Sequence, residues 1–390
     1  MRKTFKYKMY RSKRDKHLAE KIELASEIWN HFVALTRRYY EVYGTYPGYY
    51  ALKRHLTKRK QRDKAHWYGL NSQAGQDVIK RLDQAYQRFF EVPSAGRPGF
   101  KKRTRYTSFT LTQTGWKLLG GNRIRIGKRN YKFVKSRPIR GEIKTVTIKR
   151  DAVGDLWICF SAWKEAPSPK LPRTGHAVGL DFGLKCFLVT SDGEEIQAPQ
   201  YLKESLEEVQ RLHRGLSRKK RGSKNRRKAK RKLAKAYRRI SNQRRDGHFK
   251  LARRLLRDYD VAAIEDLNLD GMKRLWGRKV SDLSYYSFVK ILEHVANKER
   301  KEVRQVDRYF PSSQLCSGCG SKNSKLTLET RDWVCVECGC VHDRDVNAAT
   351  NVLERAFSMK DREGPWEVGI RPSGAAAYDA TSEANASSAA

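Results

Sequence analysis

The chain has 390 residues, and the 39% that are hydrophobic provide enough apolar material for two or three cores. Lys and Arg outnumber Asp and Glu by 83 to 42, and this surplus of 41 positive charges indicates a polyanionic partner, with nucleic acid as the first candidate. No apolar run reaches the length of a membrane-spanning helix and no signal-peptide pattern opens the chain. We therefore expect no membrane partner and a cytoplasmic location.

The first half of the chain combines two hydrophobic periods. Basic and apolar residues alternate over residues 3–10, which predicts a strand. Apolar residues then recur at helical steps in three segments, residues 15–44, 49–60 and 72–91. From Tyr106 the period becomes two, which predicts four strands, residues 107–112, 123–126, 143–149 and 156–163. These patterns predict a small β-barrel-like domain that carries a helical insert, followed by a Pro-rich linker at residues 167–172.

Two apolar strands of the second half end in acids. The first carries Asp181 between Gly179 and Gly183, two glycines that allow a ligand or another backbone to come close. A later strand ends in Glu265 and Asp266, which alternate to opposite faces, so only one of them can share a site with Asp181.

Helices and one further strand are predicted around these acids. An amphipathic helix over residues 202–216 leads into residues 218–239, which are mostly Lys and Arg and include no acid. This run keeps apolar residues at helical spacing, and a helix lying along a phosphate backbone explains it better than a solvated face does. Beyond Glu265 we expect a helix whose apolar face includes Tyr286 and a strand over residues 302–306.

Four cysteines form two CxxCG knuckles separated by fifteen residues, Cys316 with Cys319 and Cys335 with Cys338. The two-residue gap lets both sulfurs of a pair reach one ion, and the glycine that follows each pair tolerates the positive φ of the turn. This spacing predicts a closed, structural four-thiolate zinc ribbon. Cys340 and His342 are additional potential ligands that we treat as bystanders.

An acidic segment follows the second knuckle and precedes a helical pattern. Asp345 stands where that helix begins, and its apolar face contains the following residues: Ala348, Ala349, Val352, Leu353, Ala356 and Phe357. One alternative interpretation is that Asp345 or Asn347 only caps this helix. Asp343 lies two residues before Asp345 and shares its face if the segment is extended, so which of these two acids is functional stays open.

Asp181, Glu265 and Asp345 are far apart in sequence, yet each stands at the end of a strand or the start of a helix. They can converge in a strand–helix fold of the RNase H type. Three carboxylates at one place would hold two Mg²⁺ ions about 3.5–4 Å apart, which is an arrangement for phosphodiester hydrolysis. Oxygen ligands suit Mg²⁺, whereas the thiolates suit Zn²⁺.

On the basis of these motifs, the chain resembles the TnpB proteins of bacterial insertion sequences. The resemblance spans roughly residues 1–360 and rests on the paired knuckles and on several short motifs: Lys6-Tyr-Lys-Met-Tyr10, Gly179-Leu-Asp181-Phe-Gly183, the basic run at 217–225, Ile264-Glu265-Asp-Leu267 and Asp343-Arg-Asp345-Val-Asn347-Ala-Ala349. It implies a multidomain α+β and α/β protein in which a wedge-type β-barrel with a helical recognition insert precedes an RNase H-like (RuvC) nuclease domain with an embedded zinc ribbon.

The boundaries that we expect are residues 1–12 and 95–172 for the barrel, 13–94 for the insert, 173–311 and 343–365 for the nuclease domain and 312–342 for the ribbon. The Gly-, Ala- and Ser-rich composition of residues 366–390 predicts a disordered tail.

The resemblance also implies an activity, namely RNA-guided cleavage of double-stranded DNA beside a short adjacent motif. The implied catalytic acids and magnesium ligands are Asp181, Glu265 and Asp345, and the implied zinc ligands are Cys316, Cys319, Cys335 and Cys338. The expected partners are a transposon-derived guide RNA, with one protein per RNA, and a target DNA duplex in the nucleoid of a bacterium or archaeon.

Two other functions compete with this one. A cut-and-paste transposase of the Asp-Asp-Glu kind should carry a Glu on a helix as its third acid, whereas the order here is Asp, Glu, Asp. A zinc-ribbon regulator that only coats nucleic acid has no need of acids at three strand or helix ends. Divalent-dependent cleavage distinguishes the regulator from the enzymes.

Overall fold

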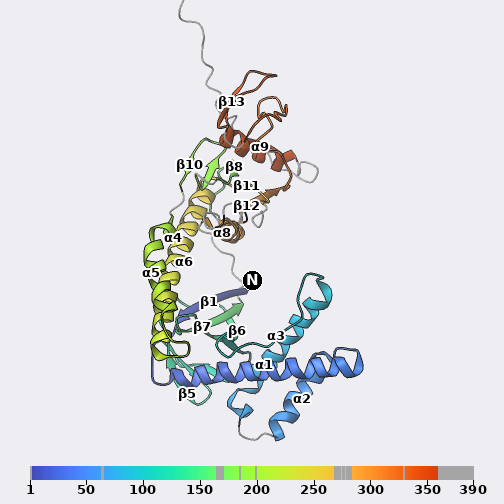
Figure 1. The fold of residues 1–390 in the computed structure, drawn as a ribbon, viewed down its shortest axis with the longest axis vertical. Helices are drawn as coiled ribbons and strands as arrows, with labels where there is room; N and C mark the ends of the chain where they lie inside the picture. Colours follow the sequence, from blue (N-terminus) through green and yellow to red (C-terminus); the bar gives the residue numbers. More distant parts are fainter. Residues whose placement is uncertain are drawn as a thin grey trace, which may run out of the picture. The chain divides into compact units, whose positions relative to one another are not determined.

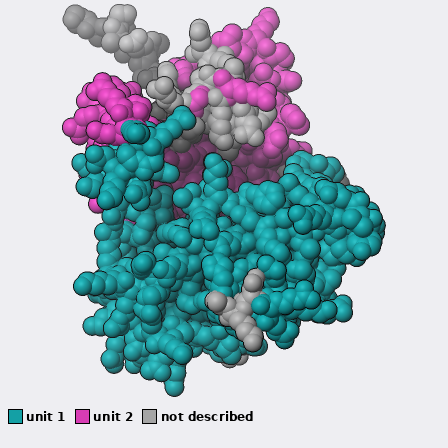
Figure 2. Space-filling model, turned by 60° about the horizontal axis from the view of Figure 1, so that its bottom comes forward, with its two compact units in different colours: residues 1–167, 220–234 teal, residues 168–219, 235–390 magenta. Residues whose placement is uncertain are grey.

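The computed structural model describes residues 2–62, 66–163, 171–183, 186–197, 200–267, 274, 277, 283–327 and 330–358. The chain divides into two compact units, residues 1–167 with 220–234 and residues 168–219 with 235–390 (Figure 2). The predicted tail at residues 366–390 and most of the predicted linker at 167–172 lie outside the described residues. Among the described helices, none is long and apolar enough to span a bilayer.

The first unit contains two antiparallel sheets. One has four strands in the order β1 (Arg2–Lys8), β7 (Leu156–Trp163), β6 (Glu142–Arg150) and β2 (Ser108–Leu111). The other has three strands, β3 (Trp116–Leu118), β4 (Arg123–Ile126) and β5 (Arg129–Lys132). The predicted strands are confirmed, and β3 and β5 are additional. A bridge between Met9 and Phe133 joins the chain after β1 to the chain after β5, but closure into a barrel stays a prediction.

The helices predicted between β1 and β2 are also confirmed. They are α1 (Asp15–Tyr43), α2 (Gly48–Arg62) and α3 (Ser72–Glu91), with a 3₁₀ turn η1 (Trp67–Gly69) before α3 (Figure 1). Ile28 and Phe32 of α1 are fully buried in the same hydrophobic core as Phe160 of β7. The helices and the four-stranded sheet thus share one core.

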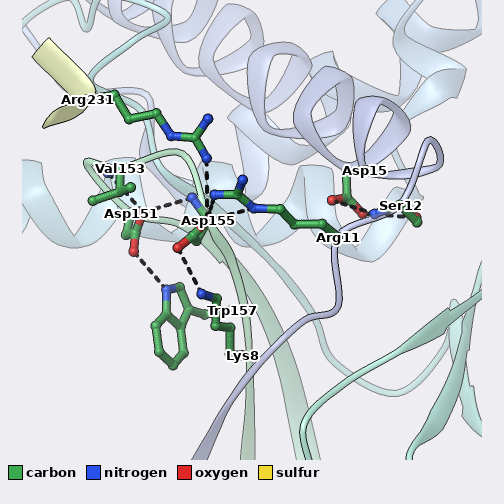
Figure 3. Close-up of polar contacts among 9 residues, drawn as sticks. All are labelled: Lys8, Arg11, Ser12, Asp15, Asp151, Val153, Asp155, Trp157 and Arg231. Carbon is green, nitrogen blue, oxygen red and sulfur yellow. Dashed lines mark hydrogen bonds and ion pairs between the residues drawn. The ribbon is translucent and has the colours of Figure 1, made fainter. Parts of the chain in front are cut away.

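A buried carboxylate also stabilises this unit. The Asp155 side chain is 2% exposed and forms ion pairs with Lys8, at 3.1 Å, with Arg11, and with Arg231, at 3.9 Å (Figure 3). Arg231 belongs to the basic segment of helix α6 (Lys224–Asp258). Three cations from separate segments therefore compensate one buried negative charge.

The second unit is built on a five-stranded sheet. Its strands follow the order β10 (Glu195–Ile196), β9 (Leu188–Thr190), β8 (Ala177–Asp181), β11 (Val261–Glu265) and β12 (Glu302–Val306). Strands β8, β11 and β12 are parallel, and β9 and β10 continue the sheet in antiparallel fashion. Besides the end of α6, the described residues of this unit form the helices α4 (Tyr201–Glu204), α5 (Leu206–Ser217), α8 (Tyr285–Glu299) and α9 (Arg344–Ser358) and a hairpin of β13 (Asp332–Val334) and β14 (Val341–Asp343).

Alternate residues of β11 belong to two different cores. Ala262 and Ile264 pack with Leu255 near the end of α6 and with Leu292 of α8. Val261 and Ala263 pack with the apolar residues of α9. Helix α9 therefore covers one face of the sheet, while α8 and the end of α6 cover the other (Figure 1).

One detail of the predicted helix α8 is wrong. The sequence pattern placed Tyr286 on the apolar face, but Tyr286 is 64% exposed and the neighbouring Tyr285 is buried. The helix begins at Tyr285, and the phase of a helical pattern is poorly constrained in its first turn.

Candidate functional site

The register of two neighbouring strands brings the first two acids together. Strands β8 and β11 are parallel and pair Leu180 with Ile264. The next residue of each strand, Asp181 and Glu265, therefore lies at the same carboxyl edge of the sheet. Glu265 lies two residues after Ala263, and Asp181 lies two residues after Gly179, which pairs with Ala263. Alternate residues of a strand share a face, and Ala263 packs toward α9, so both acids project to the α9 face. Asp266 lies just beyond the end of β11 and accepts a hydrogen bond from Arg308 at 2.8 Å.

Gly179 lets helix α9 approach this edge. A Cβ atom on Gly179 would lie 1.9 Å from the carbonyl oxygen of Ala349, a separation that no side chain can occupy. The backbone of α9 therefore rests directly on β8. Asp345 stands one turn before Ala349, in the first turn of α9, so the close approach carries it to the strand ends. The prediction that a backbone comes close at Gly179 is confirmed.

The helix cap distinguishes Asp343 from Asp345. The carboxylate of Asp343 accepts hydrogen bonds from the amides of Asp345, at 2.9 Å, and Val346, at 2.8 Å. These are the contacts of an N-cap residue, so neither Asp345 nor Asn347 caps the helix. The Asp345 carboxylate accepts a hydrogen bond from Arg331, and its negative charge contributes to the raised pKa of Asp181.

The electrostatics of the three acids reflect their proximity. Burial raises the pKa of Asp181 to about 8, and the negative charges of Glu265 and Asp345 contribute to the rise. Burial also raises the pKa of Glu265, against a hydrogen bond from Ser312 that lowers it. Partly buried carboxylates that repel one another are stabilised in their ionised form by a cation. Carboxylate oxygens are the ligands that Mg²⁺ prefers, although among the described residues only the cysteines discussed below form a group close enough to share one ion without rearrangement.

Tyr285 is a buried residue beside this edge that the sequence did not single out. Its ring lies 4.2 Å from the ring of Phe182, centroid to centroid, and Phe182 follows Asp181. Within the described residues its hydroxyl has no hydrogen-bond partner. Burial raises the pKa of Tyr285, and the charges of Glu265, Asp181 and Asp266 add to the rise.

The four predicted cysteines form one cluster. Their Sγ atoms all lie within 4.8 Å of one another, with Cys316 3.5 Å from Cys338 and Cys319 3.6 Å from Cys335. Ligands of a tetrahedral Zn²⁺ with 2.3 Å bonds are about 3.8 Å apart, so the cluster has the dimensions of a zinc site. The glycines after the knuckles have the predicted positive φ, 76° at Gly320 and 73° at Gly339.

A neighbouring hydroxyl favours the thiolate form of two of the four cysteines, whereas burial raises the pKa of Cys316. The hydroxyl of Ser321 lies 3.2 Å from the sulfur of Cys319 and 3.2 Å from that of Cys335. This contact lowers the pKa of both thiols, that of Cys335 to about 6. His342 is also close, with Nε2 3.0 Å from the Cys316 sulfur. Burial lowers the pKa of His342.

Two buried asparagines connect the cysteine cluster to α9. Asn347 and Asn351 are 2% and 4% exposed, and their side chains bond the backbone of the segment that enters the first knuckle. From the sequence, Asn347 was predicted to be at most a helix cap. The available signal was its spacing from Asn351, because two asparagines four residues apart interrupt an otherwise apolar face.

Protein-family models and known proteins that are similar to this chain carry related descriptions. A family model described as "Probable transposase" (OrfB_IS605) matches residues 159–275, and one described as "Cas12f1-like, TNB domain" matches residues 285–352. A Streptomyces pristinaespiralis protein named "Putative RNA-guided DNA endonuclease" is 33% identical over 71% of this chain and 70% of its own length. A similarly named Escherichia coli K12 protein, InsQ, is 28% identical over 85% of this chain and 86% of its own.

A solved structure entitled "Structure of the mini-RNA-guided endonuclease CRISPR-Cas_phi3" is also similar. It is 11% identical in sequence, with 94% of both chains covered and a TM-score of 0.49.

Proposed function

This chain belongs to the TnpB (OrfB) family of RNA-guided DNA endonucleases of IS605-type elements, and on that premise we propose that it cuts double-stranded DNA beside a short adjacent motif, at a place chosen by a bound RNA. The observation that carries this proposal is the convergence of three acids at one edge of the second unit's sheet. Asp181 and Glu265 end neighbouring parallel strands, and Asp345 begins the helix that rests on them.

The proposed chemistry is phosphodiester hydrolysis with Asp181, Glu265 and Asp345 as catalytic acids. Two Mg²⁺ ions held by these carboxylates would supply an activated water and stabilise the leaving oxygen. The chain's own contribution is to fix the carboxylates in place. The Ser312 hydroxyl orients Glu265, Arg331 orients Asp345, and the capping by Asp343 fixes the start of α9. Asp343 therefore has a positioning role in this proposal.

A bound RNA accounts for the choice of sequence. The basic segment of α6 and the rest of the 41-charge surplus can neutralise many phosphates. Phosphate contacts position a duplex but carry no sequence information. Base pairing with a guide supplies that information, and the protein then holds the RNA–DNA heteroduplex by its backbone.

We also assign roles to the remaining parts. The Cys316, Cys319, Cys335 and Cys338 cluster holds a structural Zn²⁺, a proposal supported by the distances between their sulfurs. Cys340 and His342 remain outside the ligand set. The second unit's sheet, with its acids, corresponds to an RNase H-like (RuvC) domain, and the sheets and helices of the first unit correspond to a wedge-type barrel with a recognition insert.

A cleavage assay tests the function. Apoprotein, RNA-loaded protein and protein loaded with a scrambled guide are compared on one linear duplex with Mg²⁺. Only the matched guide is expected to cut, beside one short motif. Equal cutting by all three would indicate an ordinary metal nuclease, and no cutting by any preparation would favour a regulator that only binds nucleic acid.

A further inference from the structure

The segment from Ser312 to Ser317 lies between the two candidate metal sites. At its start, the Ser312 hydroxyl donates a hydrogen bond to Glu265, and Ser312 itself is 6% exposed. At its end stands Cys316, the first ligand of the cysteine cluster. This short segment thus touches a carboxylate of one site and contains a thiolate of the other.

Helix α9 holds the segment at three backbone positions. The Asn351 side-chain amide donates to the carbonyls of Ser312 and Leu315, both at 2.7 Å. The Asn347 amide donates to the same Leu315 carbonyl at 2.7 Å, and its side-chain oxygen accepts from the Ser317 amide at 2.9 Å.

Asn347 and Asn351 occupy successive turns of the helix that begins with Asp345. Both asparagines are buried, so a lost bond would leave an unpaired polar group away from water. The segment and the helix are therefore fixed to each other.

These contacts form a polar bridge, which we define as Ser312, Asn347 and Asn351. The bridge reaches Glu265 through the Ser312 hydroxyl and Asp345 through the first turns of α9. It reaches the cysteine cluster through the backbone on both sides of Cys316. A movement of the first knuckle changes the position of two of the three acids.

Resting on the proposed function, we propose that the polar bridge couples the two metal sites, so that a metal on the cysteine cluster strengthens divalent-cation binding at the acids. Ser312, Asn347 and Asn351 are positioning residues in this scheme, because each acts through another group of the protein. Coupling between two sites is reciprocal in affinity, so Mg²⁺ at the acids must raise the affinity for zinc by the same factor. We expect this higher affinity to appear as slower zinc release. Coupling free energies commonly correspond to about 5–150-fold in affinity, and we expect a factor of about ten.

The test measures zinc release from the full-length, RNA-loaded protein to a chromogenic chelator, with and without Mg²⁺. In the unsubstituted protein Mg²⁺ is expected to slow release several-fold. Ser312→Ala removes only the hydroxyl on Glu265, so the release rate without Mg²⁺ should stay unchanged while the slowing by Mg²⁺ is lost. Asn351→Ala should raise the release rate itself and also abolish the slowing.

Thr350→Ala is the matched control, because the Thr350 hydroxyl bonds the Val346 carbonyl within its own helix. It should keep the slowing by Mg²⁺. A second measurement is Mn²⁺ affinity by electron paramagnetic resonance, which should fall about tenfold in Ser312→Ala and not in Thr350→Ala.

The coupling is overturned if Mg²⁺ leaves zinc release unchanged in the unsubstituted protein, or if Ser312→Ala keeps the full slowing. Asp181→Ala, assayed for cleavage alongside, separates this failure from that of the proposed function. If Asp181→Ala is inactive but Mg²⁺ does not change zinc release from the unsubstituted protein, only the proposed coupling is wrong. If Asp181→Ala cuts like the unsubstituted protein, the carboxylate site itself is wrong.

Discussion

Asp155 of the first unit is buried and the three acids of the second unit are partly buried, and the charges around them differ between the two units. In the first unit, Asp155 is surrounded by Lys8, Arg11 and Arg231, so the protein itself supplies the compensating positive charge. In the second unit, Asp181 lies near two further carboxylates that raise its pKa. Arg331 bonds Asp345, but no comparable set of cations among the described residues contacts Asp181 or Glu265.

This difference in compensating charge distinguishes Asp155, which stabilises the fold, from the acids of the second unit, which are suited to bind a cation. A buried carboxylate that is fully paired gains nothing from an added cation. Carboxylates that repel one another are destabilising until a cation neutralises them, and such sites concentrate at functional positions. Mutations and metal ions should therefore act differently on the two units.

The largest expected effect is on cleavage. Asp181→Ala, Glu265→Ala or Asp345→Ala should each lower the rate by at least about 10³-fold, because each removes a ligand of the catalytic ions. RNA and DNA binding should be nearly unchanged in gel-shift assays. The Asp343→Ala variant should still cut, with a modest loss of rate, because a missing N-cap costs only about 1 kcal/mol of helix stability. An inactive Asp343→Ala beside an active Asp345→Ala would exchange the roles of these two acids.

Loss of the proposed structural zinc should have the next largest effect, on folding. Cys319→Ala or Cys335→Ala should lower zinc content and soluble yield together, because the binding energy of a structural zinc is folding energy. Metal analysis of the purified protein measures the zinc content. A double variant of these two cysteines that keeps full zinc occupancy would refute the assignment. Cys186→Ala, outside the cluster, is the control.

Gly179→Ala should separate Asp345 from the strand ends. The added Cβ would meet the Ala349 carbonyl, and a backbone group cannot rotate away as a side chain does. Helix α9 must shift, at a cost of roughly 3 kcal/mol in the free energy of unfolding. Urea unfolding measures the cost, and cleavage should fall even at low temperature. Gly215→Ala, in helix α5 at a position with no neighbour within 4 Å of the new Cβ, should keep full cleavage and should not lower the free energy of unfolding.

Asp155→Ala tests the compensated acid. It leaves three cations without their shared partner, and because all three are partly exposed the expected loss of stability is about 2 kcal/mol. Thermal unfolding should show the same loss with and without Mg²⁺, in contrast to the acids of the second unit. Glu142→Gln, which removes an exposed acid paired only with Lys144, should have little effect. A Mg²⁺-dependent loss in Asp155→Ala would remove the distinction between the two sites.

The sequence predicted most of the helices and strands because their hydrophobic periods are strong. The six apolar residues predicted for α9 are all buried. Strand β3 has only three residues, and β5 has one apolar residue among four, so neither shows a clear period of two. The cysteine cluster follows from spacing alone.

The convergence of the three acids was harder to predict, because it depends on strand register and on the close approach at Gly179. The roles of Ser312 and Asn351 were not predicted. A lone serine or asparagine shows no periodic signal, and their partners are backbone groups distant in sequence.

The smallest expected effect is a pH dependence of stability that appears only without divalent ions. The pKa of Asp181 rises from its ordinary value of 3.8 to about 8, so the metal-free folded state binds this proton more tightly than the unfolded state does. Between these two pKa values the folded state holds more protons. Its stability must therefore fall as the pH rises through that window.

We expect the metal-free melting temperature to drop by a few degrees between pH 5 and pH 8, and Mg²⁺ to reverse most of the drop. Asp181→Asn should flatten this dependence, because the amide carries no charge at either pH. Asp155→Asn should leave the dependence intact. A metal-free protein equally stable at both pH values, with Asp181→Asn unchanged from it, would mean that the carboxylates do not repel one another and that no cation is needed to hold them together.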